Sequence, residues 1–138
     1  MLACFVLYAC GSSKQEKKVE ETPTVAAPKT DPGKLVYTTY CRSCHQAGGE
    51  GSPGLYPPLT QSETVQGNKE TLIRVILEGQ KGLITVHGVE YNNEMAKMDY
   101  LTDKQISDVL TWLRSNFENN ASSISEEEVK NVREKIAS

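Results

Sequence analysis

Apolar residues recur at helical spacing in several segments of the chain. The first segment begins with Asp31 and Pro32, an N-cap residue followed by proline at the first helical position. The residues that share its predicted buried face are Leu35, Val36 and Tyr40. A second helix is predicted over residues 69–78, and the residues expected to face inward there are Leu72, Val75, Ile76 and Leu77.

Two more helices are predicted towards the C-terminus, each opened by a capping box. Thr102 with Gln105 opens a helix that ends near Asn116, and Ser125 with Glu128 opens the last one. The stripe of the earlier helix follows the i, i+3, i+4, i+7 spacing and consists of Ile106, Val109, Leu110, Leu113 and Phe117. The stripe of the last helix consists of Val129, Val132 and Ile136.

The segments between these helices have turn and strand character. Residues 46–58 are rich in glycine and proline, which predicts an irregular loop. Residues 83–91 carry β-formers on either side of His87 and Gly88, which predicts a short hairpin-like loop. The expected class is therefore all-α, with about four to five helices. So small a domain buries limited apolar surface, and a large apolar cofactor at its centre would supply much of the core.

The N-terminal residues predict export with a lipid anchor. Residues 1–9 contain an apolar run of the length usual in a signal peptide. The sequence Leu-Tyr-Ala-Cys at 7–10 resembles a bacterial lipobox, which implies cleavage before Cys10 and attachment of diacylglycerol to its sulfur. No Lys or Arg precedes the apolar run, and the alternative is a short apolar terminus with an incidental cysteine.

Composition divides the rest of the chain into three parts. Residues 10–31 hold few apolar side chains, which predicts a disordered tether. The helical domain is expected over 32–118, and a helical extension over 119–138. The net charge of −3 gives no reason to expect nucleic-acid binding. No apolar run reaches the roughly 18 residues of a membrane span.

The sequence Cys-Arg-Ser-Cys-His at 41–45 is the attachment signature of a c-type haem. In such a site Cys41 and Cys44 form thioethers with the porphyrin, and the His45 imidazole binds the iron. A thioredoxin-like dithiol is the first alternative, but it belongs to a βαβ context that this sequence lacks. A zinc site is the second; it needs two further ligands, and the candidates are His87, Cys4 and Cys10.

A haem iron held by one histidine has either a second axial ligand or an open site. Met95 and Met98 lie close together in a polar loop, where a methionine suits a ligand better than a core gap-filler. His87 is expected at the hairpin tip, as an exposed turn residue. The residues alone leave both methionines as candidates.

From about residue 32 to the C-terminus, the chain resembles the class I cytochromes c. The matching elements are Gly33, Tyr37, Cys41, Cys44 and His45, then Pro57-Pro58-Leu59, then Tyr91-Asn92-Asn93-Glu94-Met95, and the helix from Leu101 to Arg114. The helix after Ser125 also recurs in a bacterial subgroup of this family. The resemblance implies that two helices cross at Gly33, with Tyr37 against Trp112.

The resemblance further implies a small cytochrome c fold wrapped around one covalently bound haem c with its iron. It assigns His45 and Met95 as the axial ligands. It also implies that the Pro57 carbonyl accepts a hydrogen bond from the imidazole Nδ1.

The function expected from these features is one-electron transfer by a carrier that is not an enzyme. Its partners would be a protein donor and a protein acceptor of a respiratory chain, with no small-molecule substrate. It would lie in the bacterial cell envelope outside the cytoplasm, facing the periplasm or at the cell surface, and reach the membrane through lipid on Cys10. The alternative is a haem-based sensor or peroxidase-like protein with a labile sixth ligand.

Overall fold

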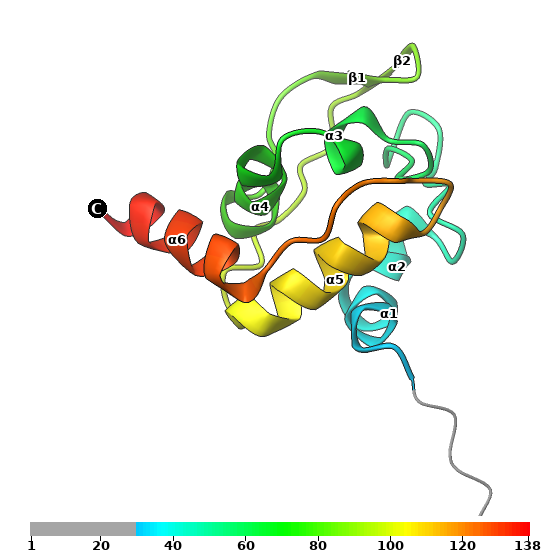
Figure 1. The fold of residues 1–138 in the computed structure, drawn as a ribbon. Coiled ribbons are helices and arrows are strands. Elements are labelled where there is room, and N and C mark those ends of the chain that lie inside the picture. Colours follow the sequence, from blue (N-terminus) through cyan, green and yellow to red (C-terminus); the bar gives the residue numbers. More distant parts are fainter. Residues whose placement is uncertain (1–29) are drawn as a thin grey trace, which may run out of the picture.

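The computed structural model describes residues 30–138. The predicted signal peptide, Cys10 and most of the predicted tether lie outside these residues. The described helices are α1 (Pro32–Val36), the π-helix η1 (Tyr37–Cys41), α2 (Arg42–His45), α3 (Glu63–Gln66), α4 (Lys69–Glu78), α5 (Asp103–Ser115) and α6 (Glu126–Ala137) (Figure 1). Strands β1 (Ile84–Val86) and β2 (Val89–Tyr91) pair antiparallel as the predicted hairpin. The all-α class is confirmed.

Helix α5 is the centre of the fold, and α1 crosses it closely (Figure 1). The crossing lies at Gly33, where a β-carbon would collide with the Asp108 carbonyl and with the Trp112 β-carbon. The rings of Tyr37 and Trp112 lie 5.1 Å apart. The predicted crossing and its aromatic pair are therefore confirmed, because only a residue without a side chain lets the two backbones come this close.

We expect Gly33→Ala to lower the free energy of unfolding by about 2 kcal/mol or more, as in other overpacked cores. Gly33 is helical, so an alanine free of contacts would instead stabilise the protein by roughly 0.5–1 kcal/mol. Chemical denaturation of the holoprotein measures the difference. Gly48→Ala is the control, because the new methyl group would meet only the flexible Glu50 side chain. Equal stabilities of the two variants would contradict a tight crossing.

The chain after α5 returns along the same helix and ends in α6 (Figure 1). The Ile124 carbonyl accepts hydrogen bonds from the hydroxyls of Ser107 and Thr111, at 2.8 and 3.0 Å. Helix α6 then packs on both α5 and α4, and it buries Val129 and Val132. The predicted capping boxes of α5 and α6 are both present. The C-terminal segment is thus part of the packed structure.

Several details of the predicted pattern are wrong. Leu35 is 57% exposed, because the buried face of the first helix runs through Gly33, Val36 and Tyr37 instead. Val75 is only half-buried, whereas Ile73 is buried, since α6 covers a second face of α4. Within residues 30–138 no helix is long and apolar enough to cross a membrane.

Phe117 and a short helix after residue 62 also differ from what the sequence predicted. Phe117 lies beyond the end of α5 and adopts a positive φ of 54°. It folds back onto Tyr37 and Trp112, with ring centroids at 5.2 and 5.0 Å. The short helix α3, capped by Ser62, has too few residues to show a period in the sequence.

Candidate functional site

One continuous helical segment, from α1 through η1 to α2, presents Cys41, Cys44 and His45. The π-helical turn ends at the first cysteine, Cys41, and such turns are frequent at functional sites. Nearby, the hydroxyls of Thr38 and Thr39 donate to backbone carbonyls four residues earlier, each at 2.8 Å. In this segment Cys41 and His45 are buried, while Cys44 is half-buried.

The His45 imidazole is 7% exposed, and its Nδ1 lies 3.0 Å from the Pro57 carbonyl oxygen. An oxygen acceptor at this distance requires Nδ1 to carry the proton, which leaves the Nε2 lone pair free to bind a metal. Burial lowers the pKa of His45, and the hydrogen bond to Pro57 opposes this shift in part. The ring is therefore held neutral and in the tautomer that an iron ligand needs.

Pro57 reaches the histidine because the loop after α2 folds tightly back on itself. The Gly51 amide donates to the His45 carbonyl at 3.0 Å, and Ser52 pairs with Tyr56. Gly51 has a φ of +65°, and a β-carbon there would meet the backbone of Tyr56 and Pro57. Glycine is thus required at this position on two grounds, its backbone conformation and the close approach of the Pro57 carbonyl.

Both cysteines of the motif are free thiols in the described part of the chain. Burial raises the pKa of the Cys41 thiol to about 11, and the neighbouring Cys44 adds to the shift. Two unpaired thiols beside a neutral, oriented imidazole form the donor set of haem c.

Met95 and Met98 both lie in the segment between the hairpin and α5. The backbone of Met95 exchanges two hydrogen bonds with Gln80, at 2.9 and 3.0 Å, and the Met98 amide donates to the Ile76 carbonyl at 2.8 Å. Both methionine side chains are half-buried and pack against the core. The segment that holds them is thus anchored to the end of α4.

His87 occupies the hairpin turn, where it is exposed and has a φ of 49°. Its Nε2 lies 3.3 Å from the Gln61 carbonyl. This is the turn position expected from the sequence, and the imidazole contacts the loop before α3.

Several contacts that support the site were not predicted from the sequence. The Tyr37 hydroxyl donates to the Gln46 carbonyl at 2.5 Å, and so ties the helix to the residue directly after His45. Gln80 pairs with Met95 across the base of the hairpin, although nothing in its local sequence marks it. Arg114 is buried and donates to three backbone carbonyls, of Ser122, Val65 and Gly67. The partners in these contacts are 8 to 49 positions apart in the chain, so the spacing patterns of a single helix or strand do not indicate them.

The fold and this donor set define a haem c protein. Residues 30–117 match the family model of cytochrome c, and the chain belongs to the cytochrome c family. The cofactor of this family is haem c, bound covalently and holding iron. The CxxCH motif is therefore a haem c attachment site, and not the redox dithiol or the zinc site that the sequence alone left as alternatives.

Among known proteins, the chain is similar to two cytochrome c-552 sequences from Thermus thermophilus. Each is 38% identical over 85 aligned residues, and the match covers 59% of this chain and 64% or 57% of the relative. The chain is also 35% identical over 109 residues to the fructose dehydrogenase cytochrome subunit of Gluconobacter japonicus, which covers 76% of this chain and 22% of that subunit. The match therefore spans less than two thirds of each of these relatives.

Proposed function

We propose that this protein is a one-electron carrier whose haem iron is bound by His45 and Met95. The observation that supports this best is the hydrogen bond from His45 Nδ1 to the Pro57 carbonyl at 3.0 Å. It leaves Nε2 free as a ligand on the residue that directly follows Cys44 of the attachment motif. A methionine thioether as second ligand favours ferrous iron and raises the reduction potential.

In this proposal the protein supplies orientation, ligation and a dry environment, and its residues make or break no substrate bonds. Cys41 and Cys44 fix the cofactor in place, while the Pro57 carbonyl keeps His45 in one tautomer. The backbone anchors at Gln80 and Ile76 hold the methionine segment in a single arrangement. Electron transfer between two six-coordinate states then requires little structural change.

Optical spectra of the holoprotein test the proposal. The protein is co-expressed with a haem-attachment system and measured oxidised, reduced, and reduced with carbon monoxide. A low-spin c-type spectrum with a thioether-to-iron band and no carbon monoxide shift would support a His/Met carrier. A high-spin spectrum, or ready carbon monoxide binding, would refute it in favour of the sensor or peroxidase-like alternative.

Proteins are the proposed redox partners, and the electron carrier is proposed to lie outside the cytoplasm. One relative is named as the cytochrome subunit of a dehydrogenase, which supports a protein donor, and members of this family are typically extracytoplasmic. The proposed organisation is a signal peptide (1–9), a lipidated tether (10–31), the cytochrome domain (32–118) and a helical extension (119–138). Lipid on Cys10 would hold the domain at the membrane.

We expect Cys10→Ser to release the holoprotein from the membrane fraction into the soluble fraction, because the substitution removes the sulfur that would carry the lipid. Cell fractionation followed by haem staining measures the change. Cys4→Ser is the matched control and should leave the distribution unchanged, because Cys4 lies within the segment proposed to be removed. Unaltered membrane association of Cys10→Ser would end the lipoprotein proposal.

A further inference from the structure

All three guanidinium nitrogens of Arg133, on α6, donate hydrogen bonds to the short segment 99–103. Its Nε donates to Asp103 Oδ1 at 2.7 Å, and its two terminal nitrogens donate to the carbonyls of Asp99 and Leu101 at 2.8 and 2.7 Å. The planar guanidinium fits this fork of three acceptors, which a lysine could not match. Two of the three acceptors are backbone atoms, so Arg133 fixes the path of the main chain there.

The two carbonyls belong to the segment 95–101, here called the ligand loop. Its N-terminal end is held by the paired backbone hydrogen bonds between Met95 and Gln80, and its middle by the bond from Met98 to Ile76. Arg133 holds its C-terminal end, directly before α5 begins. Two of the three supports are thus on the backbones of the candidate methionines, and the third lies just after Met98.

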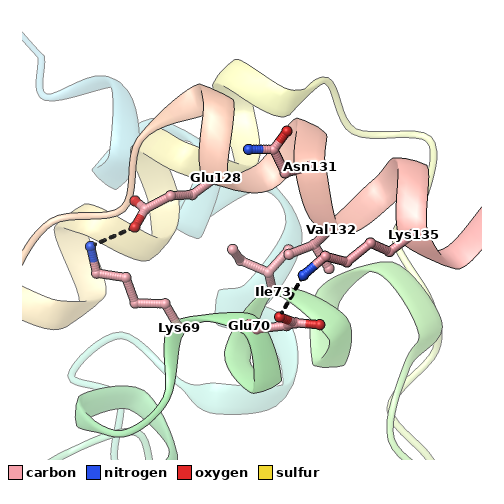
Figure 2. A pocket seen from close by; sticks show the side chains of 7 residues that line it. All are labelled: Lys69, Glu70, Ile73, Glu128, Asn131, Val132 and Lys135. Carbon is pink, nitrogen blue, oxygen red and sulfur yellow. Dashed lines mark hydrogen bonds and ion pairs between the residues drawn. The ribbon is translucent and has the colours of Figure 1, made fainter.

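Helix α6 is itself a firm support for this contact. Figure 2 shows two ion pairs that join it to α4, Lys69 with Glu128 at 2.8 Å and Lys135 with Glu70 at 3.0 Å. Between them, Val132 packs close to Ile73 (Figure 2). Because these exposed ion pairs contribute little each, the buried apolar face of α6 supplies most of its attachment.

We propose that Arg133 is a positioning residue that holds the ligand loop closed over the sixth coordination site. The inference rests on the proposed function in one respect: a methionine of the ligand loop must bind the iron. It holds equally for Met95 and Met98. An added ligand has to displace that methionine, so it competes against every contact that keeps the loop closed.

Imidazole titration of the ferric holoprotein tests this role. We expect Arg133→Ala to bind imidazole about fivefold or more tightly than the wild type, the size of a typical coupling between two sites. Arg133→Lys, which keeps the charge beside Asp103 but not the fork, should give a smaller gain. Lys135→Ala removes an α6 contact that does not touch the ligand loop, and should leave imidazole affinity unchanged.

Amide hydrogen exchange supplies a second readout on the same proteins. In Arg133→Ala the amides of Met95 and Met98 should exchange faster, while those in the middle of α5 keep their protection. Unchanged imidazole affinity in both Arg133 variants, or equal gains in Arg133 and Lys135 variants, would reduce Arg133 to a general stabilising residue and overturn the inference. The wild-type spectrum separates the two proposals, because an open sixth site in the wild type refutes His/Met ligation before any variant is compared.

Discussion

Replacing Met95 by alanine is expected to open the sixth coordination site. The ferric protein should become high-spin, the ferrous protein should bind carbon monoxide, and the reduction potential should fall. Axial ligands set haem potentials over a range of about 0.8 V, so we expect a decrease on the order of 100 mV. Optical spectra and a redox titration of the same holoprotein measure these changes.

Met98→Ala is the matched control for this experiment. Both methionines are half-buried and pack on the core, so the two truncations remove similar packing. The Met98 backbone bond to Ile76 does not depend on the side chain, and the loop should keep its course. Met98→Ala should therefore remain low-spin, with a potential close to the wild type. The opposite pattern would assign the sixth ligand to Met98.

The second large effect is expected on removing the cofactor. Several apolar side chains are only partly buried by protein, among them Leu59, Met95 and Met98, and a haem beside them would complete the core. Domains are stable by only about 5–15 kcal/mol, and a single large cavity-forming change costs about 2–5 kcal/mol. We therefore expect the haem-free polypeptide to be poorly folded, with weak helical circular dichroism and no cooperative thermal transition.

Expression in the cytoplasm without a haem-attachment system yields the chain for this measurement, and the holoprotein is the control. The chemistry of Cys41 agrees with the expectation. In the folded arrangement Cys41 is 6% exposed and burial raises the pKa of its thiol to about 11, whereas the thiolate is the reactive form of cysteine. An open chain presents a more reactive thiol for attachment. A cooperative, fully helical apoprotein would refute the prediction.

Helix positions could be predicted well because their signals are local. The capping boxes at Thr102 and Ser125 and the apolar spacing behind them depend on residues three or four apart. The crossing at Gly33 was also predictable, but from resemblance and not from periodicity. A glycine in a sequence gives no sign of which helix packs against it. The prediction that Leu35 is buried was wrong. The short apolar cluster around it fits either of two helical faces that differ by one residue, and its spacing does not distinguish them.

The sequence by itself determined the chemistry of this protein: an attachment motif at 41–45, helices that deliver it, and two methionines in a polar loop. Such features depend on neighbouring residues and on side-chain type. Only the tertiary structure decided which distant groups meet. The contact of the Pro57 carbonyl with His45 was expected from resemblance, but nothing in the sequence indicated that Gln80 meets Met95 or that Arg133 meets the end of the ligand loop. Each of these contacts involves a backbone atom, and every residue has the same backbone groups, so their partners are set by how the chain packs.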